Sequence, residues 1–377
     1  MDFDLNGEQR LLKQSVHDFL VKECPKELVR ELDESDEGYS PELWGKMAEL
    51  GWMGLVFPEE YGGLDFSFFE LIILLEEMGY NICPGPLFST VVLGGLPILT
   101  WGNEEQKKEF LPKIASGDMK LTLALTEQHA SYDVSSIRAE AVFDNGEYVI
   151  NGAKLFVPDA TVVDYFLCVV KTNEGKNAGE GVTIFLVDSK SPGIKCTLLK
   201  TLSRNKQCEV LFDNVRVPED NILGEPDRGW LAMKDLLEKA AVARCAKMVG
   251  GAQAVFDMSL QHAKRRIQFN RPIGSFQAVQ HHMANMWIDV HTSRNMLYKT
   301  AWKISERVPA SLEVAMTKVH ISDACRRVSV LGHDILGAIS FTMEHDMHLY
   351  YRRAKEGELA FGDADFQRKI VARELGL

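Results

Sequence analysis

Apolar residues recur at every third or fourth position in the early part of the chain. This spacing places apolar side chains on one face of a helix. Residues 11–24, 41–50 and 66–80 show it, and stretches rich in glycine and proline separate them. We therefore predict a helical domain over residues 1–118.

A different pattern begins near Leu121, where apolar and polar residues alternate and β-branched and aromatic residues are frequent. Such alternation is typical of strands with one buried face. The turn Asp144-Asn145-Gly146 separates two of these segments and predicts a tight hairpin. We expect a β-barrel or β-sandwich domain over residues 119–227.

The helical spacing returns after Arg228. Its long segments cover residues 230–266, 276–307, 312–336 and 365–374. Long helices joined by short loops pack as antiparallel neighbours. The sequence therefore predicts a C-terminal four-helix bundle over residues 228–377, and a multidomain α+β fold for the chain.

The composition is that of a globular protein, with 46% apolar and 25% charged residues in a chain of 377. A net charge of −12 argues against binding to nucleic acid or to an anionic membrane surface. No apolar run approaches the roughly 20 residues that span a membrane. Residues 1–23 read as an acidic amphipathic helix rather than a targeting peptide. These features predict a cytoplasmic protein.

The cysteine and histidine residues do not indicate a metal site. The seven cysteines are scattered and form no C-x-x-C pair, which also argues against a disulfide framework. His281 and His282 are adjacent, so they are poorly spaced to share a metal ion, and His345 and His348 lack a third ligand at a suitable spacing. We predict no bound metal.

Positive charge gathers at the break between the first two C-terminal helices. Lys264, Arg265 and Arg266 end the first helix, a turn follows at residues 270–274, and Ser275 is placed to cap the next helix. Guanidinium groups and the free N–H groups of a helix N-terminus both favour phosphate, so an anion site is one interpretation. A basic helix end that complements its own dipole is the other, and spacing alone leaves both open.

Within this break, six residues from Arg266 to Gln277 form the pattern R-x-x-F-x-x-P-I-x-x-F-Q. The pattern resembles the flavin-diphosphate segment of the acyl-CoA dehydrogenase family. GWMGLVFPEEYGG at residues 51–63 and NVRVPEDNILG at residues 214–224 resemble segments that the family has at matching places. Together with the order of helical and strand regions, the resemblance covers nearly the whole chain and implies the family's three-domain fold.

The resemblance implies a flavoprotein that binds FAD and an acyl-CoA thioester. In the family a carboxylate removes the α-proton of the thioester while the flavin accepts hydride from the β-carbon, and electron-transfer flavoprotein then takes the electrons. Thr126 and Phe156 occupy the positions that would contact the flavin ring. Arg266, Phe269 and Gln277 occupy positions that would hold the flavin diphosphate of a neighbouring subunit.

Several positions depart from the family pattern. Residues 125–134 read LTEQHASYDV where the family usually has T-E-P-G-A-G-S-D, so its flexible glycines are lost. Pro158 replaces a threonine whose hydroxyl and N–H would reach the flavin, and proline supplies neither donor. Asp334, Ala338 and Ser340 replace one glutamine and two glycines of a third flavin segment. The carboxylate of Asp334 would repel phosphate.

The glutamate that serves the family as base is replaced as well. Counting from Lys355 places Phe361 at that position, and the position that a minority of the family uses is Ala240. Asp363 is the nearest carboxylate, and the resemblance makes it the candidate catalytic base. Capping of the following helix is the other interpretation of Asp363, with Asp365 as a rival cap.

Different classes of function remain open. The first is a flavin-dependent acyl-CoA dehydrogenase acting on a CH–CH bond with an unusual base, as one subunit of a heteromeric tetramer. The second is a partner subunit, degenerate in its own site, that completes the FAD site of a related acyl-CoA dehydrogenase-like chain. A third is a non-redox acyl-CoA lyase or hydratase on the same fold. An intact flavin site makes the pure protein yellow, which separates these functions.

Overall fold

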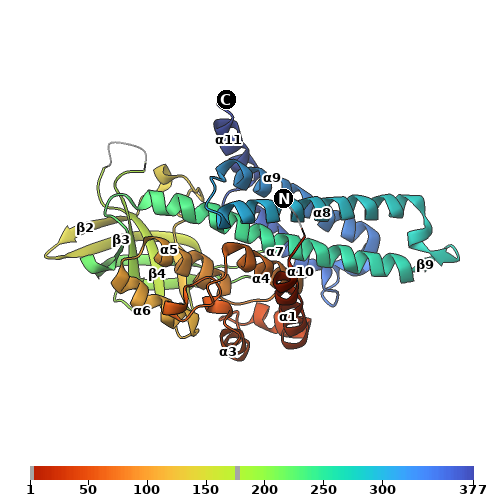
Figure 1. Ribbon diagram of the computed structural model, residues 1–377, viewed down its shortest axis with the longest axis horizontal. Coiled ribbons are helices and arrows are strands. Elements are labelled where there is room, and N and C mark those ends of the chain that lie inside the picture. Colours follow the sequence, from red (N-terminus) through yellow and green to blue (C-terminus); the bar gives the residue numbers. More distant parts are fainter. Residues whose placement is uncertain (1–3, 175–178) are drawn as a thin grey trace. The chain divides into compact units, whose positions relative to one another are not determined.

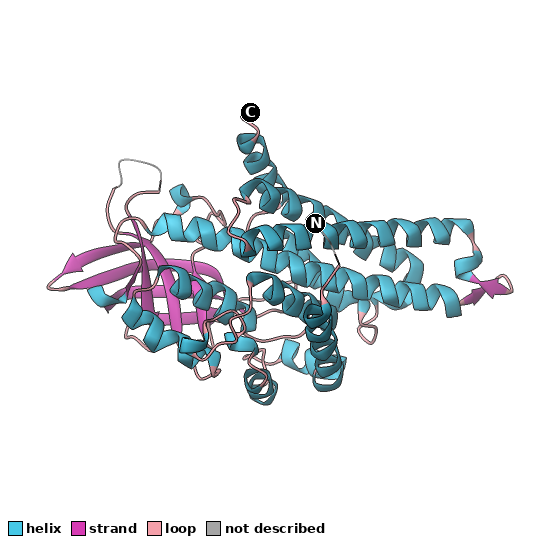
Figure 2. Cartoon of the chain, viewed as in Figure 1, coloured by secondary structure: helices cyan, strands magenta, loops and turns pink. Residues whose placement is uncertain are grey.

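The computed structural model describes residues 4–174 and 179–377, and the chain forms two compact units. The bundle unit consists of Met1–Val29, Ser67–Cys83 and Ala241–Leu377, and the sheet unit consists of Arg30–Phe66 and Pro84–Ala240. Figure 1 labels the elements along the chain, and Figure 2 separates helices from strands by colour. These units group the segments differently from the three predicted domains, whose boundaries at residues 118 and 227 stay predictions.

In the described part of the sheet unit, eight strands form one sheet in the order β6-β7-β3-β2-β4-β5-β8, with β1 added beside β4. Strand β7 alternates buried and exposed side chains, as the sequence pattern predicts, whereas β4 and β5 are buried along almost their whole length. Phe166, Phe185 and Phe212 lie in its buried core. The strands are β1 Leu121–Ala124, β2 Glu140–Asp144, β3 Glu147–Pro158, β4 Tyr165–Lys171, β5 Val182–Asp188, β6 Ile194–Leu198, β7 Gln207–Pro218 and β8 Ile222–Leu223.

The predicted hairpin between β2 and β3 is confirmed. Asp144 pairs with Glu147 at the end of the antiparallel ladder, which leaves Asn145 and Gly146 as the two-residue turn. Both have positive φ, 54° and 93°, and asparagine and glycine tolerate this backbone best. The turn therefore fixes the register between β2 and β3.

Helices of the sheet unit pack beside the strands through side-chain hydrogen bonds. The Gln106 amide on α6 (Glu104–Ala115) donates to the carbonyl of Ile222 at 2.8 Å, which joins this helix to β8. The Trp44 indole on α3 (Pro41–Glu49) donates to the carbonyl of Gly117 at 2.8 Å. A π-helical segment, η3 Phe88–Gly95, precedes α5 (Leu96–Trp101) and is buried along its whole length.

The bundle unit contains the long helices that the sequence predicts. In Figure 1, α7 and α8 run beside one another, and their contact includes Phe256 against Trp287, with ring centroids 5.3 Å apart. The predicted fold of helical, β-sheet and helical regions is confirmed. None of the helices in the described residues is both long and apolar enough to cross a membrane. The helices wholly within this unit are α1 Gly7–Glu23, α4 Phe68–Asn81, α8 Gln277–Ser305, α9 Ser311–Leu336, α10 Met347–Leu359 and α11 Ala364–Glu374. Two further helices, α2 Lys26–Glu34 and α7 Gly229–Arg265, have residues in both units.

Helices α4 and α7 approach so closely that two positions require glycine. A Cβ atom on Gly250 would lie 1.8 Å from the carbonyl oxygen of Glu76, and one on Gly79 would lie 2.1 Å from that of Lys247. A change of rotamer cannot relieve such a clash, because the backbone fixes the position of the Cβ atom and the atom that it meets is also part of the backbone. The two glycines therefore set the distance between these helices.

A buried carboxylate at this contact joins four helices of the bundle unit. Glu76 on α4 accepts from the Lys13 ammonium of α1 at 2.9 Å, from Arg294 Nε of α8 at 2.8 Å and from the Tyr298 hydroxyl at 2.7 Å. Arg294 also donates to the side chain of Gln253 on α7 at 3.0 Å. Burial raises the pKa of the Glu76 carboxyl, but Arg294 and Lys13 outweigh burial and hold this pKa at about 2.

We expect Glu76→Gln to lower thermal stability at neutral pH, and the loss to shrink as the pH falls below about 4.5. The folded-state pKa lies below the unfolded value, so the stabilisation is complete above the unfolded pKa and disappears as pH falls towards the folded one. The difference between the unfolded and folded pKa values of Glu76 corresponds to about 3 kcal/mol of stabilisation at neutral pH. Melting temperatures of both proteins from about pH 7.5 down to about pH 3.5 measure it.

Glu42→Gln is the matched control, because Glu42 pairs with Lys46 on an exposed helix face, where ion pairs contribute little. The prediction would be contradicted if the melting temperatures of Glu76→Gln and the unmodified protein differed by the same amount over the whole pH range.

Candidate functional site

The predicted anion site is a tight hairpin at the end of α7. Its strands β9 (Ile267–Gln268) and β10 (Arg271–Pro272) pair directly, so Phe269 and Asn270 form a two-residue turn with φ of 50° and 60°. Asn270 tolerates this backbone, as expected for a position where the family has glycine. The prediction that Ser275 caps α8 was wrong. Its hydroxyl donates to the carbonyl of Pro272, and α8 has no side-chain cap because a short 3-10 turn leads into it.

We call residues 264–277 the basic tip. Four cations lie here, Lys264, Arg265, Arg266 and Arg271, and within the described residues none of them forms an ion pair. The sequence contains no aspartate or glutamate between Asp257 and Asp289. In a chain with a net charge of −12, the basic tip is therefore a local region of positive potential.

The three predicted diphosphate residues lie together on the basic tip. Arg266, Phe269 and Gln277 are all exposed, and the Phe269 side chain is 86% exposed. The guanidinium of Arg271 stacks on the Phe276 ring at 4.0 Å, which holds one cation beside them. This arrangement offers an anion several hydrogen-bond donors and an exposed aromatic ring. No existing ion pair has to break before the anion binds.

In the sheet unit, Thr126 and Phe156 also come together. The N–H of Leu155 donates to the carbonyl of Thr126 at 2.7 Å, so the two predicted ring contacts lie on adjacent backbone segments. Phe156 has a φ of 56° where the register of β3 against β7 shifts, and its ring is 47% exposed. This left-handed residue interrupts the alternation of the strand and leaves a large aromatic ring in contact with solvent. Pro158, two residues on, offers no N–H to a ligand.

A buried ion pair lies directly beneath these residues. The Lys154 ammonium, fully buried, contacts Glu127 Oε1 at 2.7 Å and donates to the carbonyl of Val169 at 2.5 Å. The other oxygen of Glu127 accepts from the N–H of Arg138 at 2.8 Å. Because Glu127 adjoins Thr126 and Lys154 lies two residues before Phe156, this pair fixes the backbone under both predicted flavin-ring contacts.

In the third flavin-like segment, residues 334–341, the buried polar side chain forms hydrogen bonds with a neighbouring side chain and with the backbone of the segment. Ser340 is fully buried, and its hydroxyl lies 2.7 Å from His333 Nδ1 and donates to the carbonyl of Gly337 at 2.6 Å. The Phe341 ring stacks on His333 with centroids 4.6 Å apart. Asp334 is exposed on the same segment. These residues form a closed cluster with an exposed carboxylate, which does not fit a phosphate ligand.

At the position expected for the base, Phe361 is half-buried with a φ of 57°. Its carbonyl accepts from the Gln367 amide at 2.9 Å. Asp363 is exposed and caps α11, because its Oδ1 accepts from the N–H of Phe366 at 2.8 Å. The geometry thus places Asp363 in the capping role, while a role as base stays a prediction.

The turn that carries Phe361 follows a helix end held by a buried lysine. Lys318 on α9 is fully buried, and its ammonium donates to the carbonyls of Gly357 and Glu358 at the end of α10. Burial lowers the pKa of Lys318 to about 8. Glu356 lies 3.8 Å from Arg244, and Glu358 lies 3.1 Å from Lys355, so both neighbouring carboxylates have cationic partners.

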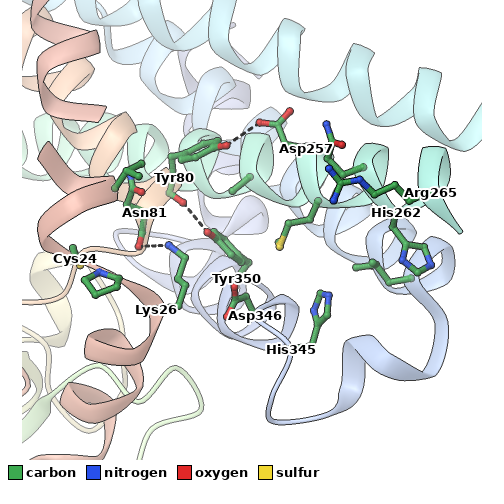
Figure 3. Close-up of a pocket in the computed structure, with 16 residues that line it drawn as sticks. Cys24, Lys26, Tyr80, Asn81, Asp257, His262, Arg265, His345, Asp346 and Tyr350 are labelled. Atoms are coloured by element: carbon green, nitrogen blue, oxygen red, sulfur yellow. Dashed lines mark hydrogen bonds between the residues drawn. The ribbon is translucent and has the colours of Figure 1, made fainter. Parts of the chain in front are cut away.

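A pocket of about 900 Å³ lies in the bundle unit, and its lining includes His262 and Arg265 at the end of α7, next to Arg266 (Figure 3). Its wall is tied by hydrogen bonds from the Tyr80 hydroxyl to Asp257 at 3.1 Å and from the Tyr350 hydroxyl to the carbonyl of Tyr80 at 2.8 Å. Lys26 donates to the carbonyl of Asn81 at 2.7 Å. Across the described residues, no group of three or more His, Cys, Asp or Glu side chains is arranged to hold a metal ion.

Known proteins match these features along the chain. Residues 6–118 match the acyl-CoA dehydrogenase N-terminal domain, residues 122–215 the middle domain and residues 227–376 the C-terminal domain. The chain is 32% identical to the probable acyl-CoA dehydrogenase YngJ of Bacillus subtilis (strain 168), over 100% of both chains. The chain belongs to the acyl-CoA dehydrogenase family.

Solved structures related to the acyl-CoA dehydrogenase family share its fold. Butyryl-CoA dehydrogenase from Megasphaera elsdenii matches with a TM-score of 0.92 and 27% identity, covering 100% of both chains. A chain of the ChsE4–ChsE5 complex from Mycobacterium tuberculosis matches with a TM-score of 0.91 and 28% identity, covering 100% of this chain and 99% of that one.

Sequence reasoning missed the ion pair between Lys154 and Glu127, although it used the residues beside both. A lysine in a strand of an otherwise apolar pattern is a signal that could have suggested a buried partner, because buried charges are paired. The partner itself, 27 residues away in the sequence, required the structure.

We expect Lys154→Met to lower the free energy of unfolding by about 3–5 kcal/mol, because it leaves the Glu127 carboxylate buried without its cation. The double variant Lys154→Met with Glu127→Gln should recover much of this loss, since neither residue is then charged. Urea unfolding followed by fluorescence measures both.

Arg216→Ala is the control, because Arg216 forms an exposed pair with Asp144 and should contribute under about 1 kcal/mol. A Lys154→Met variant as stable as this control would show that the buried pair is dispensable.

Proposed function

We propose that this protein is a flavin-dependent acyl-CoA dehydrogenase that works as one subunit of a heteromeric assembly. In this proposal its basic tip holds the FAD diphosphate of a second acyl-CoA dehydrogenase-like chain. The substrate is an acyl-CoA thioester that is oxidised at the CH–CH bond next to its carbonyl. Electron-transfer flavoprotein is the proposed electron acceptor, and a cytoplasmic location and a tetramer belong to the same proposal.

The uneven distribution of the departures from the family carries this proposal. Arg266, Phe269 and Gln277, which in the family act on a neighbour's flavin, are present and exposed. The residues that would serve this chain's own flavin and base are changed, as at Pro158 and Phe361. A chain that keeps the part of the site it contributes to a neighbour, and loses the part it uses itself, suits a heteromeric partner.

FAD, when bound, supplies the acceptor for the hydride that leaves the substrate. Arg266 would donate to a diphosphate, and the exposed Phe156 ring would lie against a flavin ring. Pro158 has no N–H for that ring, and the Ser340 hydroxyl is already used within its own cluster. The basic tip therefore fits a diphosphate well, whereas the ring side of this chain fits FAD only in part.

The comparison with the ChsE4–ChsE5 complex also supports a heteromer, because that assembly contains two differently named chains and one of them shares this fold. A catalytically silent partner subunit is the second candidate function. It is favoured by Phe361 at the base position and by the capping hydrogen bond of Asp363. The two candidates differ in whether this chain performs proton abstraction.

We expect the chain purified alone to retain less than one FAD per subunit after desalting, and co-expression with its partner to yield yellow protein with fewer flavins than subunits. Arg266→Glu should lower the flavin retained by the co-expressed assembly, since a charge-assisted hydrogen bond contributes about 1.5–3 kcal/mol. Native mass spectrometry and flavin absorbance measure composition and stoichiometry together.

Lys264→Glu is the matched control, because it makes the same charge change on the basic tip at a position outside the motif. It should retain more flavin than Arg266→Glu. A homotetramer that holds a full complement of FAD and oxidises an acyl-CoA unaided would refute the heteromeric proposal.

Asp363 remains the candidate base of this chain. Asp363→Asn keeps the cap of α11, because asparagine and aspartate cap equally well, so stability should change by less than about 0.5 kcal/mol. Exchange of the substrate α-proton in deuterated water should fall by about 100-fold or more, since asparagine cannot accept the proton.

Asp365→Asn is the control, since Asp365 lies next to the cap and pairs with Arg368 at 2.9 Å on the surface. It should leave the exchange rate unchanged. If Asp363→Asn exchanges the α-proton as fast as this control, Asp363 acts only as a helix cap. Absence of any α-proton exchange by the unmodified chain would instead support the silent-partner function.

A further inference from the structure

The pocket of the bundle unit combines a group of basic side chains with an apolar lining. All of its lining residues belong to this unit, and a volume of about 900 Å³ is typical of a site for a small molecule. Arg265, His262 and His345 form what we call the cationic end of the pocket. The apolar residues of the lining are Val21, Pro25, Ala254, Met258 and Leu336. A pocket with these two parts suits a ligand that has a charged group and an apolar body.

One face of α7 supplies much of this lining. Its lining residues recur at spacings of three and four, so they share one side of the helix. They are Ala254, Asp257, Met258, Gln261, His262 and Arg265. Arg266 follows the last residue of α7 and is not among the lining residues. Arg265 and Arg266 are therefore adjacent in the sequence, but only Arg265 reaches the pocket.

The cationic end offers hydrogen-bond donors that the protein itself does not use. Among the described residues, the side chains of His262 and Arg265 form no hydrogen bond or ion pair. His345 Nδ1 accepts from the N–H of Met347 at 3.1 Å, so the proton of the neutral ring is on Nε2. Figure 3 shows His262 and Arg265 on α7 and His345 on the opposite wall. One guanidinium and two imidazoles are thus available to a ligand.

Two carboxylates also line the pocket, and neither cancels the charge of Arg265. Asp257 accepts hydrogen bonds from two neighbouring side chains, at 3.1 and 3.0 Å. It precedes Arg265 by eight residues, which is about 12 Å along a helix and beyond the Debye length of about 8 Å at physiological salt. Asp346 lies beside Lys26 (Figure 3). The cationic end therefore favours an anion.

We propose that this pocket binds an organic phosphate monoester. The phosphate accepts hydrogen bonds from Arg265, His262 and His345, and the apolar body of the ligand lies against the apolar lining. A guanidinium presents parallel N–H groups to a phosphate, and the three terminal oxygens of a monoester can accept from several side chains at once. The site is independent of the function proposed above, because no residue assigned there to FAD lines the pocket.

The test measures binding of phenyl phosphate to the purified full-length protein by isothermal titration calorimetry. Phenyl phosphate carries the proposed charged group on an apolar ring, whereas phenol has the ring alone and inorganic phosphate has the charged group alone. All titrations use the same ionic strength, because salt screens exposed charges. We expect phenyl phosphate to bind about 10-fold or more tightly than either fragment, since only phenyl phosphate contacts both parts of the pocket.

Variants locate the binding site. Arg265→Gln should weaken the binding of phenyl phosphate by about 10- to 100-fold, because it removes a charge-assisted hydrogen bond, and His262→Gln by about 3- to 10-fold. Lys264→Gln and Arg266→Gln are the matched controls, since they remove the same charge from neighbours that do not line the pocket. Each control should change the affinity by less than about 3-fold.

Equal affinity for phenyl phosphate and inorganic phosphate would indicate an adventitious ion only and overturn the proposal. Equal affinity for phenyl phosphate and phenol, or no binding of phenyl phosphate, would overturn it as well. A larger loss in Arg266→Gln than in Arg265→Gln would place the ligand on the basic tip instead of in the pocket.

Hydrogen exchange of the unmodified protein decides the question even if a variant fails to fold. Phenyl phosphate should slow amide exchange in the peptides that cover residues 254–265 and 336–350, which line the pocket. Protection confined to residues 266–277, or no change in either pocket segment, would contradict the assignment.

Discussion

The buried carboxylate of Glu76 connects the helices of the bundle unit. Glu76 is surrounded by Lys13, Arg294 and Tyr298, and through them the helices α1, α4, α7 and α8 share one electrostatic centre. Such a cluster is stable only when each member is satisfied, because a buried charge without its partner is strongly unfavourable. The backbone contact between Gly250 and Glu76 allows α4 to reach this position. Charge pairing and helix packing therefore constrain one another at the same residue.

Much of the fold could be predicted from the sequence, because local patterns specify local structure. The long helices, the strand region and the Asp144–Gly146 hairpin each follow from spacing or turn chemistry that needs no distant partner. The start of α8 could not be predicted in the same way. Ser275 has the chemistry of a helix cap, but the preceding 3-10 turn orients its hydroxyl towards Pro272. A backbone geometry set by neighbouring residues decides such cases.

For the candidate site too, the features that depend on neighbouring residues could be predicted from the sequence, and those that depend on distant residues could not. The grouping of Arg266, Phe269 and Gln277 follows from their closeness in the sequence, and the resemblance to the family assigns them a ligand. The ion pairs that determine the environment elsewhere are distant in the sequence, such as Lys154 with Glu127 and Arg294 with Glu76. Long-range contacts of this kind carry no local pattern.

The left-handed turn at Phe269 and Asn270 has a consequence for how the basic tip would bind the proposed diphosphate. Two positive-φ residues between two paired strands hold the hairpin in one conformation before any ligand arrives. An anion that docks there does not need to order the loop, so little conformational entropy opposes its binding. The strain of placing a phenylalanine in this backbone is met during folding rather than during recognition. In the proposed function, the basic tip is thus a preorganised site, and its affinity for the diphosphate would depend on its rigidity as much as on its charges.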